Sequence, residues 1–173
     1  YEKRKKDLYL VDFDDLLLEP LKLLRVDSVR EKYTKRFKYV LVDEYQDINR
    51  PQFLLTKIIS SGSRNLTAVG DPDQSIYSWR GADPKIILNF REDFPDAKII
   101  YLERNYRSTQ SILEAANSVI ANNESRFPKK LWTERGRGRP VVVYVGDSDI
   151  EEGRFIVDEI SSLTKEGYSF KDI

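Results

Sequence analysis

Two adjacent carboxylates, those of Asp43 and Glu44, form the first candidate for chemistry in this chain. They follow residues 39–42, a short apolar run typical of a buried parallel strand, and open α/β sheets bind ligands at the carboxyl ends of such strands. There one carboxylate can hold a divalent cation while its neighbour addresses a water molecule, as hydrolysis of a phosphate anhydride requires. The alternative for a bare acidic pair is an ordinary transition from strand to loop.

A second polar loop, residues 71–80, follows the next apolar run. It combines acids and Gln74 with two aromatic residues, Tyr77 and Trp79, and with Arg80. This mixture suits a site that contacts phosphate on one side and stacks nucleic-acid bases on the other, where each stacked base contributes about 1–3 kcal/mol whatever the sequence. The alternatives are a surface glutamine, core aromatic residues and a surface salt bridge. The polar neighbours of the two aromatic residues are unlike those of a core.

The composition excludes several classes of site. The 173 residues contain 0 Cys and 0 His, which removes disulfide frameworks, thiolate zinc sites, cysteine nucleophiles and the commonest general base. Acid–base chemistry must then use carboxylates, Lys or Tyr, and a metal must be a hard cation held by oxygen. Lys plus Arg and Asp plus Glu both number 29, which excludes a uniformly basic nucleic-acid coat but permits a local basic groove. No apolar run approaches the roughly 18 residues of a membrane span, and we expect a soluble, cytoplasmic protein.

Apolar runs and helical periodicity alternate along the chain, which indicates an α/β fold with parallel strands and right-handed crossovers. The predicted strands are residues 39–42, 66–69, 98–102 and 140–145, and the predicted helices are residues 13–24, 51–59, 84–94, 108–122 and 151–163. Pro20 is expected to kink or split the first helix, and Ser108 or Thr109 to cap the fourth. Residues 1–6 are predicted to be an exposed lead-in and residues 134–139 a loop.

A basic stretch with interleaved aromatic residues lies in the carboxyl-terminal half. It comprises Arg126, Lys129, Lys130, Arg135, Arg137 and Arg139, together with Phe127 and Trp132. Such a stretch can follow a phosphate backbone, and the alternative is a solvated loop.

Four blocks of the sequence resemble segments of the UvrD/PcrA/Rep family of superfamily-one DNA helicases. Residues 43–47 are similar to motif II of that family, residues 69–82 to motif III and residues 105–109 to motif IV, while residues 12–17 resemble a segment that precedes motif II. The blocks occur in the family's order, and the resemblance covers nearly the whole chain.

The resemblance implies a RecA-like parallel sheet flanked by helices. Residues 1–107 would form the later part of the first RecA-like ATP-binding domain, and residues 108–173 the beginning of the second. The family's phosphate-binding loop, Gly-x-x-x-x-Gly-Lys-Ser/Thr, precedes motif II and does not occur in this sequence, and the family's last motifs would lie beyond Ile173.

The resemblance also assigns roles around a nucleotide, which would be ATP with Mg²⁺. Asp43 would bind Mg²⁺, Glu44 would act as the catalytic base, and Gln74 would contact the γ-phosphate. Arg107 would act as an arginine finger, a contribution of about 10³–10⁵ in rate in other phosphoryl-transfer enzymes, and Tyr106 would pack on the adenine. For Arg107 and Tyr106 the alternatives are an arginine at a helix start and a half-buried tyrosine.

On the DNA side, Tyr77 and Trp79 would stack on bases of single-stranded DNA, and Arg80 would link this face to the phosphate face. The implied activity is that of an ATP-dependent 3′–5′ helicase or translocase in repair or replication. Its partners would be single-strand/duplex junctions, the rest of the helicase chain, and repair or replication proteins.

Three alternatives remain beside this activity. They are a subunit of a helicase–nuclease complex, a non-catalytic helicase-like interaction module, and a nucleoside triphosphatase that acts on RNA. The presence of Glu44, Gln74 and Arg107 together argues against the interaction module, because a scaffold has no need of all three.

We predict that the isolated 173-residue chain neither binds ATP tightly nor hydrolyses it, because no phosphate-binding loop supplies the backbone amides, the Lys and the hydroxyl ligand of Mg²⁺. Titration calorimetry at micromolar protein should show only the heat of dilution, and a tight ATP complex would contradict the prediction. The absent strand of that loop should also leave apolar sheet edges exposed, so we expect the chain to self-associate or to be marginally stable.

Overall fold

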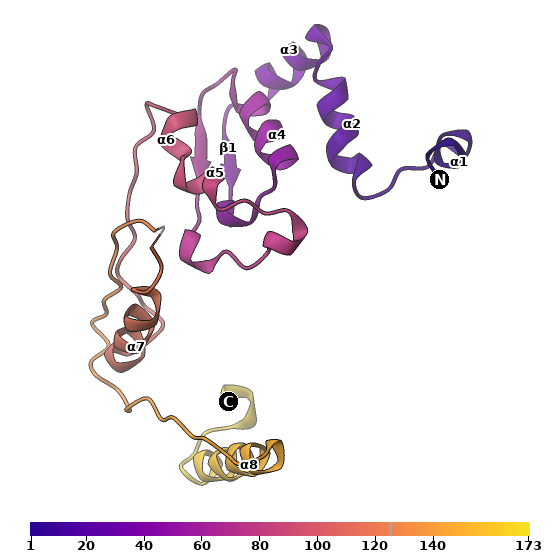
Figure 1. The fold of residues 1–173 in the computed structure, drawn as a ribbon. Coiled ribbons are helices and arrows are strands. Elements are labelled where there is room, and N and C mark those ends of the chain that lie inside the picture. Colours follow the sequence, from indigo (N-terminus) through magenta and orange to yellow (C-terminus); the bar gives the residue numbers. More distant parts are fainter. Residues whose placement is uncertain (125) are drawn as a thin grey trace. The chain divides into compact units, whose positions relative to one another are not determined.

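The computed structural model describes residues 1–124 and 126–173, and its helices and short parallel strands confirm the α/β class (Figure 1). The chain forms two compact units. The first contains residues 1–103 and 120–130, and the second contains residues 104–119 and 131–173. Each unit is therefore built from two separate stretches of sequence.

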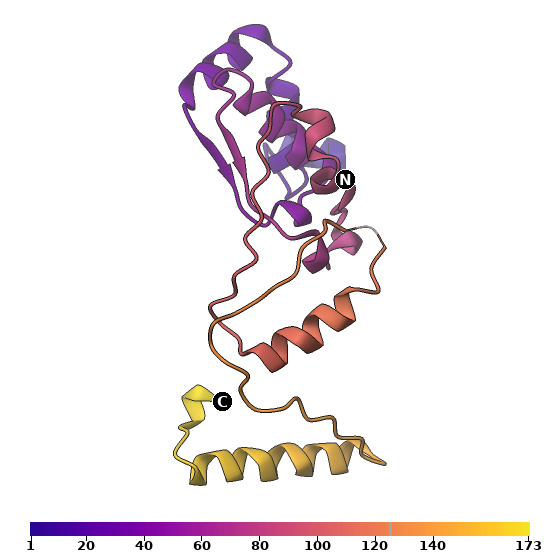
Figure 2. The same cartoon turned by 90° about the vertical axis from the view of Figure 1, so that its left-hand side faces the viewer.

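The described part of the first unit contains a two-stranded sheet of β1 (Val40–Val42) and β2 (Leu66–Ala68). The strands are parallel, as predicted, and the register pairs Val42 with Ala68 (Figures 1 and 2). The helix α4 (Arg50–Ser60) connects the two strands and packs against β1. Because parallel neighbours end at the same edge of a sheet, the polar segments that follow β1 and β2 come together.

A complete capping box starts α4. The Asn49 side chain accepts a hydrogen bond from the Gln52 amide at 3.0 Å, and the Gln52 side chain accepts one from the Asn49 amide at 2.9 Å. Pro51 occupies the first turn, where a backbone donor is not needed, as predicted. The capping box thus pairs two backbone amides that a helix start would otherwise leave without a partner. It fixes the residue at which α4 begins.

The core of the first unit is small. Its buried members are Tyr45, Ile48, Phe53, Ile86 and Ile87, and the half-buried residues Val42, Leu54, Ala68, Phe90, Phe94 and Phe127 pack against them. The short helix α5 (Lys85–Leu88) supplies both buried isoleucines of its sequence, and α6 (Phe90–Asp93) supplies Phe90. These two helices replace the single helix predicted over residues 84–94, because the backbone at Asn89 (φ −95°, ψ 18°) leaves helical geometry.

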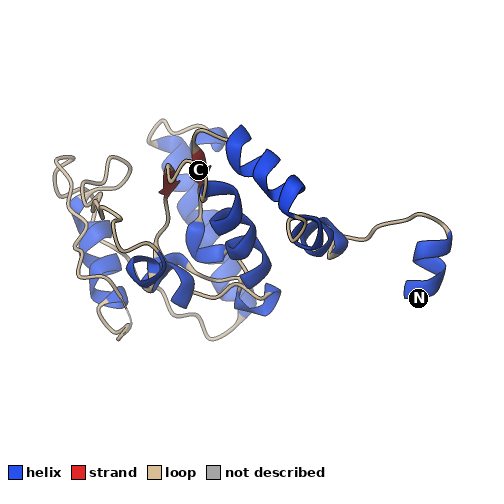
Figure 3. Ribbon diagram, turned by 90° about the horizontal axis from the view of Figure 1, so that it is seen from above, coloured by secondary structure: helices blue, strands red, loops and turns tan. Residues whose placement is uncertain are grey.

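Three helices precede the sheet: α1 (Glu2–Asp7), α2 (Asp15–Leu23) and α3 (Asp27–Arg36), drawn in blue with the others in Figure 3. The predicted lead-in over residues 1–6 is largely exposed but helical, and Lys5 fastens it to the start of α2 through an ion pair of 2.7 Å with Asp15. The predicted split at Pro20 does not occur, because α2 continues through that residue. Both α2 and α3 pack against α4.

Two predicted strands are wrong. Residues 98–102 and 140–145 are not strands, and Val142 and Val143 are 74% and 84% exposed, so the second run is not buried either. An extended apolar run becomes a strand only when another strand lies beside it to pair its amides and carbonyls. Within the described residues, neither run has such a neighbour.

The second unit contains the helices α7 (Gln110–Ile120) and α8 (Asp149–Lys165). The amides of Gln110 and Ser111 at the start of α7 donate to the carbonyls of Gly136 and Arg137, so backbone from the predicted loop 134–139 satisfies this helix start. At α8 the side chain of Ser148 accepts from the Glu151 amide. Nowhere in the described chain is a helix both long enough and apolar enough to cross a membrane.

Phe53→Ala should lower the free energy of unfolding by about 3–5 kcal/mol. The Phe53 side chain is 1% exposed, and the cationic groups of Arg50 and Lys57 lie 4.8 and 5.5 Å from its ring centroid, so truncation leaves a cavity and removes both contacts. Urea unfolding followed by circular dichroism measures the change. Phe13→Ala, at a side chain that is 89% exposed, is the control and should change it by less than about 0.5 kcal/mol; equal losses would show that Phe53 is not a core residue in solution.

Candidate functional site

The candidate site lies where β1 and β2 end. Backbone hydrogen bonds join the two strand ends: the Val69 amide donates to the Val42 carbonyl at 2.8 Å, and the Tyr45 amide donates to the Val69 carbonyl at 2.8 Å. This brings the acidic pair Asp43 and Glu44 to the same edge as the loop that begins at Asp71. The two polar segments that the sequence singled out therefore form one site.

Glu44 has an unusual backbone conformation. Its φ of 49° and ψ of 44° lie in the left-handed region, which costs an L-residue roughly 1–2 kcal/mol. The neighbouring Asp43 supports this turn, because its Oδ1 accepts a hydrogen bond from the Glu44 amide at 2.9 Å. Residues held in such conformations cluster at functional sites, and this outlier falls on the predicted catalytic base.

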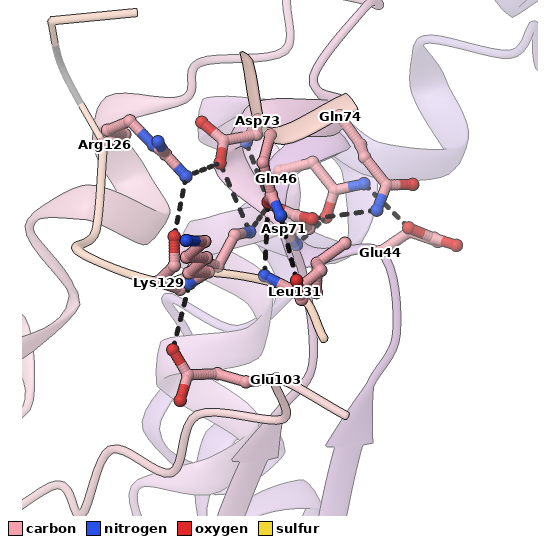
Figure 4. A network of polar contacts seen from close by, with 11 residues as sticks. Glu44, Gln46, Asp71, Asp73, Gln74, Glu103, Arg126, Lys129 and Leu131 are labelled. Atoms are coloured by element: carbon pink, nitrogen blue, oxygen red, sulfur yellow. Dashed lines mark hydrogen bonds and ion pairs between the residues drawn. The ribbon is translucent and has the colours of Figure 1, made fainter. Parts of the chain in front are cut away.

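Gln46 is a residue of the candidate site to which the sequence assigned no role. Its side chain is buried, with only 1% of the residue exposed, and Nε2 donates to Glu44 Oε2 at 2.7 Å and to Asp47 Oδ2 at 3.2 Å. Its Oε1 accepts from the Asp71 amide at 2.9 Å (Figure 4). One amide group thus connects the segment after β1 to the segment after β2. One feature of the sequence could have indicated its burial. Gln46 lies between Tyr45 and Ile48, two large side chains that are buried on either side of a short turn.

Gly70 permits this connection. A Cβ atom at residue 70 would lie 2.7 Å from Gln46 Oε1 and 3.0 Å from the Tyr45 amide nitrogen, closer than a side chain tolerates. The second strand can therefore approach the buried amide only because residue 70 has no side chain.

Asp71 organises the second loop. Its carboxylate accepts from the Asp73 amide at 3.0 Å and so caps the 3₁₀ turn Pro72–Gln74, and its Oδ2 accepts from Gln74 Nε2 at 2.9 Å. Lys129 donates to the other carboxylate oxygen, Oδ1. Gln74, the predicted γ-phosphate contact, is thus exposed and held on Asp71.

The pKa of the Asp71 carboxyl lies below its ordinary value of 3.8. Burial by itself would raise that pKa, but the hydrogen bonds from Lys129 and Gln74 stabilise the carboxylate and outweigh the effect of burial. A lowered pKa in the folded state means that this stabilisation is present above the ordinary value and is lost as the pH falls through the lowered one.

Tyr77, Trp79 and Arg80 form an exposed aromatic–cationic group. The two ring centroids are 6.3 Å apart, and the Arg80 guanidinium lies 5.2 Å from the Tyr77 ring centroid and 4.6 Å from that of Trp79. Trp79 is 72% exposed, which excludes the alternative of a core tryptophan. The loop returns to the site segment at its end, because the Asp83 amide donates to the Ile48 carbonyl.

Tyr106 and Arg107 belong to the second unit. The Asn105 side chain accepts from the Arg107 amide at 2.9 Å, and Arg135 Nη1 donates to the carbonyls of Tyr106 and Arg107, both at 3.0 Å. The Arg104 guanidinium lies 4.9 Å from the Tyr106 ring centroid. Tyr106 is 72% exposed rather than half-buried, so the backbone of this pair is fixed while the tyrosine ring is accessible.

Many cations of the basic stretch contact other groups of the described chain. Its partners lie within the chain: Lys129 with Asp71 and Asp73, Arg126 with Asp73, Arg135 with the carbonyls of residues 106 and 107, Arg137 with Glu114, and Arg139 with Glu166. Each of these contacts lies within one unit, and those of Arg137 and Arg139 are exposed to solvent.

The donor set suits a metal that is shared with a phosphate ligand. In the described part of the chain no group of three or more His, Cys, Asp or Glu side chains is arranged to hold a metal. The exposed Asp43 carboxylate, with one oxygen on the Glu44 amide, provides an oxygen ligand. Mg²⁺ is commonly bound by one or two carboxylates together with waters and substrate phosphates, so a single carboxylate fits it.

Comparison with known protein families gives a match for nearly every residue of the chain. Residues 1–95 match the family described as UvrD/REP helicase N-terminal domain, and residues 100–173 match the UvrD-like helicase C-terminal domain.

Curated relatives agree with these matches. The chain is 49% identical over 168 residues to the ATP-dependent DNA helicase PcrA of Bacillus subtilis, covering 96% of this chain and 23% of that protein. It is 44% identical to the PcrA helicase of Staphylococcus aureus strain Mu50, over 100% of this chain and 24% of that protein, and 46% identical to that of Leuconostoc citreum, over 94% and 22%. The chain thus spans about a quarter of the length of these relatives.

Gln46→Leu should lower the free energy of unfolding by about 1–3 kcal/mol although leucine is more apolar, because it leaves the Asp71 amide and the Glu44 carboxylate without their buried partner. Gln46→Glu keeps the size but places a carboxylate beside Glu44 and Asp47, so its melting midpoint should recover towards that of the wild type as the pH is lowered. Thermal unfolding over a pH series measures both. A Gln46→Leu variant as stable as the wild type would show that the amide does not hold the site together.

Proposed function

The chain belongs to the UvrD/REP helicase family, and on that premise we propose that it forms the catalytic centre and the DNA-stacking face of an ATP-dependent DNA helicase. One observation carries the proposal: the buried Gln46 amide joins the predicted base Glu44 to the loop that bears Gln74. A motor needs such a link, because hydrolysis on one segment must be communicated to the segment that holds DNA. In this proposal residues 1–107 belong to the first RecA-like domain and residues 108–173 begin the second.

The residues after β1 would perform the hydrolytic step. Mg²⁺, when bound with ATP, would supply charge neutralisation on the phosphates, and Asp43 would be its ligand from this chain. Glu44 would accept a proton from the attacking water. The hydrogen bond from Gln46 Nε2 to Glu44 Oε2 fixes the orientation of that carboxylate, and its other oxygen, Oε1, would address the water.

Gln74 would report the γ-phosphate to the rest of the loop. Its side-chain amide donates a hydrogen bond to Asp71 Oδ2. When a phosphate binds, the amide would exchange this acceptor for a phosphate oxygen. An uncharged amide suits this exchange, because it binds a phosphate oxygen without holding it as tightly as a cation would. From the second domain, Tyr106 would pack on adenine and Arg107 would stabilise the transferring phosphoryl group.

The exposed group of Tyr77, Trp79 and Arg80 would bind single-stranded DNA. Stacking on aromatic rings tolerates any base, which a translocating protein requires, and the guanidinium beside both rings adds a cation for the backbone. We further propose 3′–5′ movement at single-strand/duplex junctions, in the cytoplasm, together with the rest of the helicase chain and with repair or replication proteins.

Two alternative functions can be compared with the same site. A subunit of a helicase–nuclease complex would use the same site for the same step. A non-catalytic interaction module is disfavoured by the strained Glu44 backbone and by its hydrogen bond to Gln46, which a scaffold would not need. The absence of a phosphate-binding loop within the given sequence is the reason to propose that the isolated segment is inactive.

Glu44→Gln, in the full-length helicase carrying this segment, should lower DNA-stimulated ATP hydrolysis by about 10²–10⁴-fold, the usual contribution of a positioned general base. Steady-state hydrolysis with and without single-stranded DNA measures the loss. Glu92→Gln, at an exposed glutamate of α6, is the matched control and should retain full activity. Hydrolysis that ignores both DNA and Glu44→Gln would remove the motor function and favour the interaction module.

A further inference from the structure

Residues 126–130 return to the first unit and are fixed there by several independent contacts. Phe127 packs against the core of the unit, with its ring centroid 6.2 Å from that of Tyr101. The Lys130 amide donates to Glu103 Oε1 at 3.0 Å, and Arg126 Nη2 donates to the Lys129 carbonyl at 3.1 Å. The segment therefore holds its cationic side chains in defined positions rather than in a solvated loop.

These cations face the loop that carries Gln74. The Lys129 ammonium contacts Asp71 and lies 3.4 Å from Asp73 Oδ2, and Arg126 Nη2 lies 3.2 Å from that same Asp73 oxygen (Figure 4). The exposed fractions of the Lys129 and Asp73 side chains are 15% and 6%. Charges this deeply placed are stable only when they are paired, so each side of this cluster depends on the other.

Asp71 connects Lys129 to Gln74. One carboxylate oxygen, Oδ1, accepts from Lys129, and the other, Oδ2, accepts from Gln74 Nε2 at 2.9 Å. Without Lys129, two carboxylates in the same short loop would face a phosphate ligand with their full negative charge, and Asp71 would hold the Gln74 amide more tightly. With Lys129 in place, the charge of Asp71 is shared, and the amide is free to exchange Asp71 for another oxygen acceptor.

We propose that Lys129 is a positioning residue for ATP hydrolysis, which acts through Asp71 to set the orientation and release of Gln74. This inference rests on the proposed function, because it takes Gln74 to be the γ-phosphate contact. It deepens that function by adding a cation from outside the helicase motifs of the sequence. The Lys129 ammonium contacts Asp71 and Asp73, so in this proposal its effect reaches the catalytic step through Gln74.

The test uses the full-length helicase and compares Lys129→Met, Gln74→Ala and the double variant. Lys129→Met, which keeps the side-chain volume and removes the charge, should lower kcat for DNA-stimulated ATP hydrolysis by about 10- to 100-fold, the size of effect expected from a misplaced catalytic group. KM for ATP should change by less than about threefold. A residue that acts only in the catalytic step lowers kcat without weakening the binding of ATP. Adding Lys129→Met to Gln74→Ala should cause no further loss, since both changes disable one unit.

Two controls separate this role from a structural one. Lys98→Met, at an exposed lysine of the same unit, should leave kcat unchanged, and Lys129→Arg should restore most of the activity that Lys129→Met loses. Melting midpoints are measured for every variant. If Lys129→Met does not fold, Lys129→Gln, which retains a donor for Asp71 without the charge, takes its place with the same expected loss of kcat.

Each contrary outcome has a distinct meaning. A loss of kcat that multiplies with that of Gln74→Ala, or a change in melting midpoint with normal kcat, overturns the positioning role of Lys129 and leaves the proposed function standing. Normal hydrolysis by Gln74→Ala itself overturns the role of Gln74, and the inference about Lys129 falls with it.

Discussion

The site depends on one buried side-chain amide. Gln46 has two donor contacts on the segment after β1 and one acceptor contact on the segment after β2, so a single planar group fixes the relative position of the two loops. A buried amide gains from these bonds only when all of them are made, because each unpaired polar atom in a low-dielectric interior is costly. The geometry of the strand ends is therefore specified more tightly than apolar packing alone would specify it. The glycine at position 70 and the left-handed backbone of Glu44 are local accommodations to that requirement.

The neighbouring cluster of Asp71, Asp73, Arg126 and Lys129 is also stable only when its polar groups are paired, and here the groups carry full charges. Both arrangements place an acceptor or donor of the candidate catalytic loops against a partner from a different stretch of sequence. The loop of residues 71–80 contains two short 3₁₀ turns, Pro72–Gln74 and Ser78–Arg80, and has little other regular structure. Its conformation is instead imposed from two sides, by Gln46 through the Asp71 amide and by Lys129 through the Asp71 carboxylate.

The sequence predicted the parts of this structure that local pattern controls. The apolar runs at β1 and β2, their parallel order, the helix after Pro51 and the meeting of the two acidic loops follow from short-range signals. Residues 98–102 and 140–145 carry the same apolar signal, but strand formation also needs a neighbour, which composition cannot supply. The bridging role of Gln46 and the ion pair of Lys129 with Asp71 join positions that are 25 and 58 residues apart in sequence, and no local pattern marks such pairs. The break at Asn89 reflects tertiary packing, because two short helices place Ile86, Ile87 and Phe90 on one core.

The discontinuous make-up of the first unit has a consequence for the order of synthesis. As the chain leaves the ribosome, β1, β2 and the loop of Asp71 and Asp73 emerge well before Arg126 and Lys129, and residues 104–119 of the other unit come between them. During that interval the two carboxylates have no cationic partner from the returning segment, and Phe127 is not yet available to the core. Contacts at such sequence separation form late, so the Gln74 loop should reach its final conformation only after part of the second unit has been made.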